Sequence, residues 1–164
     1  MAVKQLRPVG DFPPTGIFRR LFAAGYDLLL LLAALMVTTL LYLGAHILIS
    51  GEPAAHQQAE EGAYVGDPIL TLIVLLVTVA FYTWFWTKKG QSLGMQAWRI
   101  RLQQPDGRTI TGRQALIRLA VAQASWLCVG LGFFWQLWDH QARTWHDIAS
   151  GTQLVTLPKG TFKD

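Results

Sequence analysis

Residues 21–49 read LFAAGYDLLLLLAALMVTTLLYLGAHILI, and Asp27 is the only Asp, Glu, Lys or Arg among them. A helix of about 20 apolar residues is long enough to cross a lipid bilayer. A cleaved signal peptide is the competing interpretation, but its apolar region would be about 7–15 residues long and closer to the N-terminus. The stretch therefore predicts a membrane-spanning helix over residues 19–49.

A second uncharged run, ILTLIVLLVTVAFYTWFW, covers residues 69–86. It ends in aromatic residues, including Trp84 and Trp86, and Lys88 and Lys89 follow. Tyr and Trp side chains favour the level of the lipid headgroups, where an apolar ring and a polar edge are both satisfied. This run predicts a second spanning helix over residues 68–87.

The third apolar segment, residues 115–138, has a mixed composition. It contains Arg118, Gln136 and the pair Gly130 and Gly132. Its length permits a crossing, whereas its glycines and polar residues equally permit a broken, re-entrant or surface-lying path. We expect a helical segment over residues 112–138, and its path stays open at this stage.

The composition excludes several classes of protein. The chain has 164 residues, of which 52% are hydrophobic and 15% charged, whereas soluble domains carry roughly 25% charged residues. Intrinsic disorder would require low hydrophobicity and high net charge. The single cysteine, Cys128, excludes a disulfide scaffold, and no ligand spacing of Cys and His indicates a metal site. We expect an integral membrane protein in contact with lipid, without metal or cofactor.

The distribution of basic residues predicts the orientation. Residues 50–68 contain no Lys or Arg and four acidic residues, whereas basic residues precede the first span and fill the connection 88–114. By the positive-inside rule, the N-terminus and residues 88–114 are cytoplasmic, and the loop 50–68 is external. The net charge of +4 therefore does not point to nucleic acid. These basic groups also suit anionic lipid headgroups at the cytoplasmic face.

The connection after the second span is patterned like folded structure. Ser92 can cap a short helix that ends near Trp98, and residues 98–102 alternate apolar and charged as a half-buried strand does. Pro105-Asp106-Gly107 indicates a turn, so that residues 109–111 return and complete a hairpin over 98–111.

Two further local signals follow. Thr111 and Gln114 resemble a capping box at the start of the third helical segment, and residues 151–158 form another strand candidate. If this tail pairs with the hairpin, both lie on one side of the membrane, and the third segment must enter and return.

Asp27 is the sharpest candidate for function. A carboxylate at the centre of a spanning helix costs roughly 2.5–3.5 kcal/mol on insertion scales. Three interpretations stay open: a wetted acid at the headgroup level, a buried structural pair, or a proton or cation site. Arg118 is the better partner for Asp27, because Arg20 lies two helical turns away; alternatively, Arg118 extends its charged end to the interface.

A second polar stretch contains His146 and Asp147. Neighbouring residues of a helix point in different directions, which argues against an acid–base pair. No nucleophile with a supporting arrangement and no phosphate-binding loop accompanies them. We expect that the chain is not an enzyme.

Several motifs together resemble the RDD family of small bacterial membrane proteins, named for an Arg and two Asp residues. RLFAAGYD at 20–27 resembles its opening motif, GQSLG at 90–94 its middle section, and WHDIASGT at 145–152 its closing stretch, with the second Asp at Asp147. Arg118 matches a recurrent second Arg, and the match covers residues 16–157. The chain departs from the family at Gly25-Tyr26, where an aliphatic pair is usual, and at 141–143, which is poorer in arginine.

The resemblance implies a multi-pass protein of the bacterial inner membrane. It also implies a role related to transport, since some members of the family are reported as sodium/proton antiporters. Two or three helices cannot enclose a pathway, so this role implies a homo-oligomer or a membrane partner.

These observations predict an all-α membrane protein with two transmembrane helices, a third helical segment that spans or re-enters, and a small cytoplasmic β-hairpin. Its parts are a tail over 1–15, the membrane domain over 16–157 and a second tail over 158–164. The leading function is transport, of protons, cations or another ligand, through a polar centre at Asp27 and Arg118, with Arg20 and Asp147 at the cytoplasmic mouth. The rival is a non-transporting assembly module in which the same residues are structural.

Overall fold

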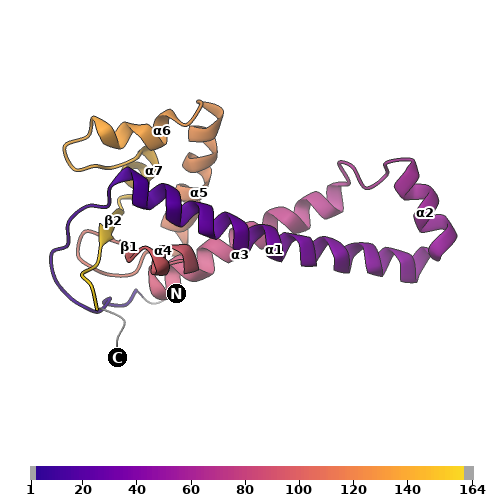
Figure 1. Ribbon diagram of the computed structural model, residues 1–164, viewed down its shortest axis with the longest axis horizontal. Coiled ribbons are helices and arrows are strands. Elements are labelled where there is room, and N and C mark those ends of the chain that lie inside the picture. Colours follow the sequence, from indigo (N-terminus) through magenta and orange to yellow (C-terminus); the bar gives the residue numbers. More distant parts are fainter. Residues whose placement is uncertain (1–2, 161–164) are drawn as a thin grey trace. The chain divides into compact units, whose positions relative to one another are not determined.

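The computed structural model describes residues 3–160, so that the predicted C-terminal tail is described only as far as Gly160 (Figure 1). Two long apolar helices dominate it: α1, Ile17–Ser50, and α3, Pro68–Lys89. Both are long and apolar enough to cross a membrane, which confirms the two predicted spans. Their large apolar side chains are mostly exposed, as lipid-facing residues are.

The chain divides into two compact units. The second unit, residues 28–81, contains most of α1, the short helix α2, Glu52–Glu60, and the first part of α3. Asp67 begins α3 by accepting hydrogen bonds from the backbone N–H groups of Ile69 at 2.7 Å and Leu70 at 2.9 Å. Its carboxylate also accepts from the hydroxyl of Tyr42 at 2.9 Å. The start of α3 is therefore tied to α1 inside this unit.

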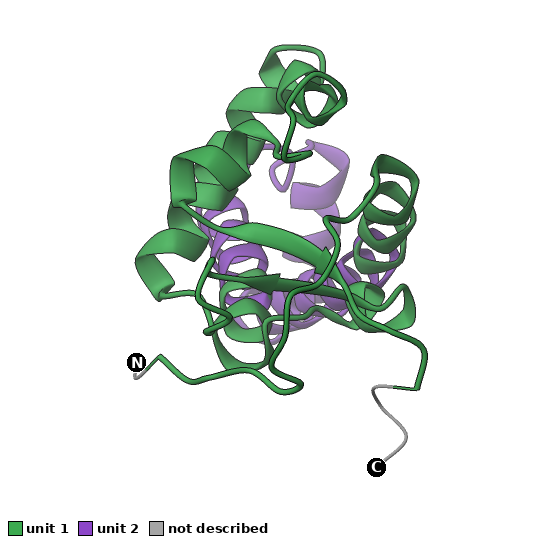
Figure 2. Ribbon diagram, turned by 90° about the vertical axis from the view of Figure 1, so that its left-hand side faces the viewer, with its two compact units in different colours: residues 1–27, 82–164 green, residues 28–81 purple. Residues whose placement is uncertain are grey.

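The first unit, residues 1–27 and 82–164, contains a small sheet (Figure 2). Strand β1, Ile100–Gln103, pairs antiparallel with β2, Gln153–Thr156. The segment before α1 lies along the other edge of β2, since Thr15 N donates to Leu154 O at 3.0 Å. The pairing of the tail with the 98–102 strand is thereby confirmed.

The predicted hairpin over 98–111 is correct at its first strand and its turn, and wrong in the partner of that strand. Residues 109–111 form no strand, because this return segment pairs with the N-terminal tail. Thr109 N donates to Lys4 O at 2.8 Å, and Gln5 and Arg108 form an isolated bridge. The strand that pairs with β1 is therefore β2, and not residues 109–111.

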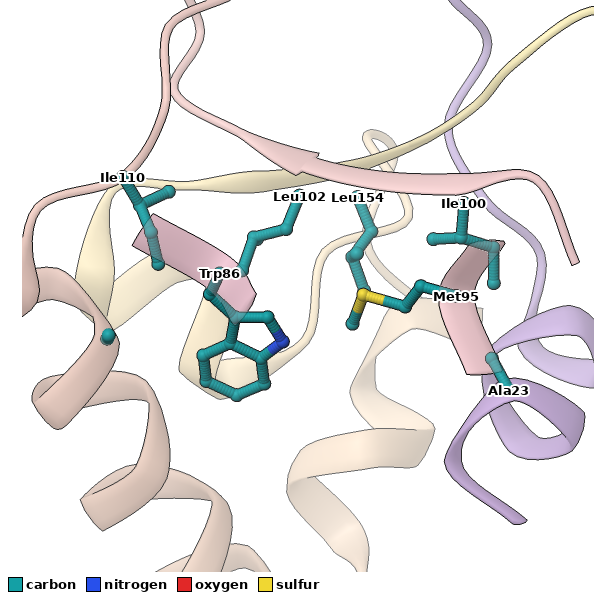
Figure 3. Close-up of a cluster of buried hydrophobic side chains, with 8 residues drawn as sticks. Ala23, Trp86, Met95, Ile100, Leu102, Ile110 and Leu154 are labelled. Carbon is teal, nitrogen blue, oxygen red and sulfur yellow. The ribbon is translucent and has the colours of Figure 1, made fainter. Parts of the chain in front are cut away.

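One face of the sheet covers the hydrophobic core (Figure 3). Ile100 and Leu102 point to this face, as the predicted alternation requires. The strand is not half-buried as expected, because Arg101 on the other face is also buried, where it donates to Gln103 Oε1 at 2.8 Å. The core also contains the following residues: Ala23, Trp86, Met95, Ile110, Ala115 and Leu154. It therefore joins the first turns of α1 and the end of α3 to both strands.

The helix starts follow the predicted capping signals. Helix α4, Leu93–Ala97, is capped by Ser92, whose side chain accepts from Met95 N. Helix α5, Gly112–Leu127, begins with a capping box formed by Thr111 and Gln114. Both local predictions are confirmed.

The third apolar segment is broken. Helix α5 is followed by α6, Leu131–Phe134, and the 3₁₀ turn η1, Trp135–Leu137, and the two parts are bent by 111°. Gly130 permits the bend, because its φ of 77° lies in the left-handed region that favours glycine. A Cβ at Gly132 would collide with the side chain of Ser125. The broken path, one of the alternatives left open above, is the one observed; helix α7, Trp145–Ser150, follows it.

Candidate functional site

Asp147 is the centre of a buried ion-pair cluster. It is the third residue of α7, where it forms a capping box with Thr144. One oxygen of its carboxylate accepts from Arg20 Nη1 at 2.6 Å, and the other accepts from Arg118 Nη1 at 2.6 Å. Thr144 N also donates to this carboxylate, at 3.1 Å. The side chain of Asp147 is 0% exposed, so both arginines hold it away from solvent.

Each arginine has further partners that connect separate elements. Arg20, at the start of α1, donates to the carbonyl oxygens of Thr15 at 3.0 Å and Ala142 at 2.8 Å. Arg118, on α5, donates to Thr152 Oγ1 at 2.5 Å. Its guanidinium carbon lies 5.6 Å from the centre of the Trp86 ring. The cluster therefore joins α1, α5, α7 and the entry to β2.

The electrostatics of the cluster favour an ionised Asp147. Burial alone would raise the pKa of Asp147, but the charges of Arg118 and Arg20 oppose this and hold the pKa below its ordinary value. Two guanidinium groups then share one carboxylate, which leaves one positive charge in excess.

His146 lies beside this cluster as a neutral side chain. It is buried and packs against Phe133, with ring centres 5.0 Å apart. Burial, with the nearby charge of Arg118, lowers the pKa of His146 to about 3. The imidazole therefore carries no charge near neutral pH, and its buried Nδ1 atom has no hydrogen-bond partner among residues 3–160.

Asp27 forms a separate site with the start of α4. Its carboxylate accepts from Gly94 N at 2.8 Å and from the hydroxyl of Ser92. Asp27 is 2% exposed, so the interpretation of this residue as a wetted acid is wrong. The approach is close enough that a Cβ at Gly94 would collide with the carbonyl oxygen of Ala23. Only glycine fits at that position without a shift of backbone.

The predicted polar centre of Asp27 and Arg118 is wrong as a pair. The structure places Arg20, Arg118, His146 and Asp147 together, and places Asp27 with the 92–94 turn. Arg118 pairs with Asp147 because α5 packs against α7, which carries that carboxylate inward. Arg20 and Asp147, both predicted at the cytoplasmic mouth, are in direct contact.

Two hydrogen-bonded neighbours of these carboxylates, Thr144 and Ser92, are not among the predicted site residues. Thr144 precedes Asp147 by three residues, which is the spacing of a capping box and could have been recognised. Ser92 was recognised as a helix cap, but no local pattern showed that Asp27 would reach it across 65 positions.

No group of three or more His, Cys, Asp or Glu side chains within residues 3–160 is placed to hold a metal ion. A model of the RDD family matches residues 14–151. Searches of the curated proteins and of the solved structures gave no match.

Proposed function

This chain belongs to the RDD family, and from that premise we propose that it is an oligomeric transport protein of the bacterial inner membrane, coupled to protons or cations. Asp27 is the group that binds the proton or cation in this proposal. The pair of Asp27 and Ser92 takes the place of the pair of Asp27 and Arg118 that the sequence had predicted.

The observation that carries the proposal is the environment of Asp27. It is a buried carboxylate with neutral donors, Ser92 and Gly94, and no ion pair to a basic side chain in the described part of the chain. Asp147, by contrast, has two arginines. A buried carboxylate that lacks a counter-ion is costly, so that it favours binding of a proton or a cation.

The number of helices supports the proposed oligomer. Two spanning helices and a broken third segment are too few to surround a pathway. The apolar surfaces of α1 and α3 are largely uncovered within the chain, so that they are available to lipid and to further copies.

The proposed topology follows from the sheet. Strand β2 and the segment before α1 are hydrogen-bonded, so the two ends of the membrane domain lie on one side if α1 and α3 both cross. The broken third segment must then enter and return. All Lys and Arg residues lie within 1–27 and 82–164, whereas residues 28–81 carry only acidic charges. The positive-inside rule makes the shared side cytoplasmic.

The two ion pairs of the Asp147 carboxylate favour a second candidate function. Both oxygens of this carboxylate accept from arginines, and Arg20 also donates to two backbone carbonyls. Such a cluster suits a non-transporting assembly module whose polar residues lock elements together. We propose no enzymatic activity in either case, because a neutral, enclosed His146 is poorly suited to take up a proton near neutral pH.

The test is proton-coupled sodium flux in proteoliposomes for wild type, Asp27→Asn and Asp106→Asn. An Asn at position 27 can still accept from Gly94 N, so that the fold is retained while the charge is lost. Asp106 is half exposed and serves as the matched control, since the chemical change is the same.

We expect flux in wild type and in Asp106→Asn, and none in Asp27→Asn, with an unchanged oligomer and thermal stability. Absence of flux in wild type above empty liposomes would reject transport of these ions. Undiminished flux in Asp27→Asn would reject the assigned role of the carboxylate.

A further inference from the structure

A cavity of about 430 Å³ opens beside the Asp147 cluster. It is lined by the charged residues Arg20, Asp147 and Arg143, which form its polar side here, and by apolar residues that include Phe12 and Pro14. Ligand sites commonly have volumes of about 300–1,000 Å³ and combine apolar walls with a few polar groups. Asp27 does not line this cavity, so the inference below is independent of the proposed transport role.

The charge at the polar side is positive. Arg20 and Arg118 share the single carboxylate of Asp147, which leaves one cation in excess in a buried setting. Arg143 adds a further guanidinium, which forms an ion pair with Asp139; Nη2 of Arg143 lies 2.9 Å from Oδ1 of Asp139. A buried charge without compensation is costly, so that an anion at this surface is stabilised.

The arginines retain donors that the protein does not use. Arg20 donates once from each of its three nitrogens, which leaves one N–H on Nη1 and one on Nη2. Arg143 directs Nε and Nη2 to Asp139, and its Nη1 has no hydrogen-bond partner within residues 3–160. The Arg143 side chain is 39% exposed, so that it can reorient toward a ligand.

We propose that this cavity binds the phosphate group of an organic phosphate, with the apolar part of the ligand against Phe12 and Pro14. Phosphate oxygens accept in-plane pairs of hydrogen bonds from guanidinium groups, and arginine is the residue best suited to this recognition. A phosphate also presents enough oxygens to meet guanidiniums from two elements, α1 and the 140–143 loop. The cavity is much larger than an inorganic ion, which favours a ligand with an organic portion.

Two sources can supply such a phosphate: the headgroup of a membrane phospholipid and a soluble organic phosphate. The cavity borders the start of α1, since Pro14 precedes this helix by three residues. This position is compatible with a headgroup from the adjacent bilayer.

The experiment uses the full chain in maltoside micelles, which contain no phosphate. The probes are phosphatidylglycerol, glycerol 3-phosphate and, at equal ionic strength, chloride. Binding is followed by the rise in melting temperature with probe concentration and, for the lipid, by native mass spectrometry. The variants are Arg143→Gln and the matched control Arg113→Gln, because Arg113 is an exposed arginine outside the cavity.

We expect Arg143→Gln to weaken phosphate binding about tenfold, as the loss of one charge-assisted hydrogen bond does, and Arg113→Gln to leave it unchanged. Arg143→Lys, which keeps the charge, should give an intermediate affinity and serves if the Gln variant is unstable. Binding of phosphatidylglycerol alone identifies the lipid as the source, and binding of glycerol 3-phosphate identifies a soluble ligand. Binding of neither probe, or equal weakening by Arg113→Gln and Arg143→Gln, would overturn the proposal.

Discussion

Arg20, in the first turn of α1, donates to the carboxylate of Asp147 at 2.6 Å across 127 positions of the sequence. Two stretches of this chain that are far apart in sequence, residues 20–27 and 145–152, are therefore in contact. Arg118 completes the cluster from α5 at the same distance. The start of α1 is thereby bound to α7, the helix that follows the broken third segment.

The substitution Asp147→Asn should strongly destabilise the first unit. It would leave two arginines without their carboxylate. One of them, Arg118, has a side chain that is only 2% exposed and cannot reach solvent. Breaking a buried pair in this way costs roughly 3–5 kcal/mol. Denaturant unfolding in detergent, followed by tryptophan fluorescence, to which the buried Trp86 contributes, measures the loss.

Asp106→Asn is the control for this prediction. Asp106 pairs with Arg108 at 3.3 Å on the surface, where both side chains are at least half exposed. Exposed pairs contribute about 0–1 kcal/mol. Equal losses in the two variants would show that burial of the Asp147 cluster has no energetic consequence.

His146 should make the stability of the protein depend on pH. Burial lowers its pKa from 6.5 to about 3, so between these values the unfolded chain binds a proton that the folded chain does not. Unfolding is then favoured as the pH falls below 6.5, and full stability is present above it. In this window the unfolding equilibrium constant should rise up to about tenfold per pH unit of acidification.

The variant His146→Phe should remove this slope. Phe fits the apolar contact with Phe133, and the replaced Nδ1 atom makes no hydrogen bond in the described part of the chain. Unfolding between about pH 4.5 and 6.5, above the ordinary titration range of Asp, is the measurement. The exposed His140, changed to Asn, is the control. A slope that persists in His146→Phe would assign the pH dependence to another group.

Gly94→Ala should destabilise the contact between α4 and the first turns of α1. The added Cβ would meet the Ala23 carbonyl and the Asp27 carboxylate, which are held in place by the packed helix. Overpacking of this kind costs roughly 1–3 kcal/mol. Gly25→Ala is the matched control on α1, because a Cβ there meets nothing within 4 Å. Thermal unfolding in detergent should separate the two variants, and a similar effect of both would contradict the close approach.

Cysteine labelling should place both ends of the membrane domain on one side. Cys128, the only cysteine, is first replaced by Ser, and single cysteines are then introduced at Asp11, Glu60 and Lys159, which are all exposed. A membrane-impermeant maleimide should react at positions 11 and 159 from the same side of a sealed vesicle, and at 60 from the other. Labelling of 159 together with 60 would mean that the broken segment crosses completely.

The elements of this fold were predictable because their signals are local. Length and hydropathy predicted α1 and α3, side-chain alternation predicted β1, and capping pairs such as Thr111 and Gln114 predicted helix starts. Each of these patterns lies within a few turns or a few residues of chain. The burial of Asp27 was not predictable in this way, and the pairing of β1 with the tail could be stated only as a hypothesis, because neither contact is visible within one segment.

The sequence by itself determined that the chain enters a membrane, since apolar transfer depends on composition and length alone. It also indicated Arg20, Asp27, Arg118, His146 and Asp147 as candidate functional residues. Only the tertiary structure decided how they combine, giving Asp147 to two arginines and Asp27 to the 92–94 turn. The physical reason is that each charged side chain has several possible partners along the chain. The packing of distant elements brings only some of these partners within hydrogen-bond distance in a buried setting.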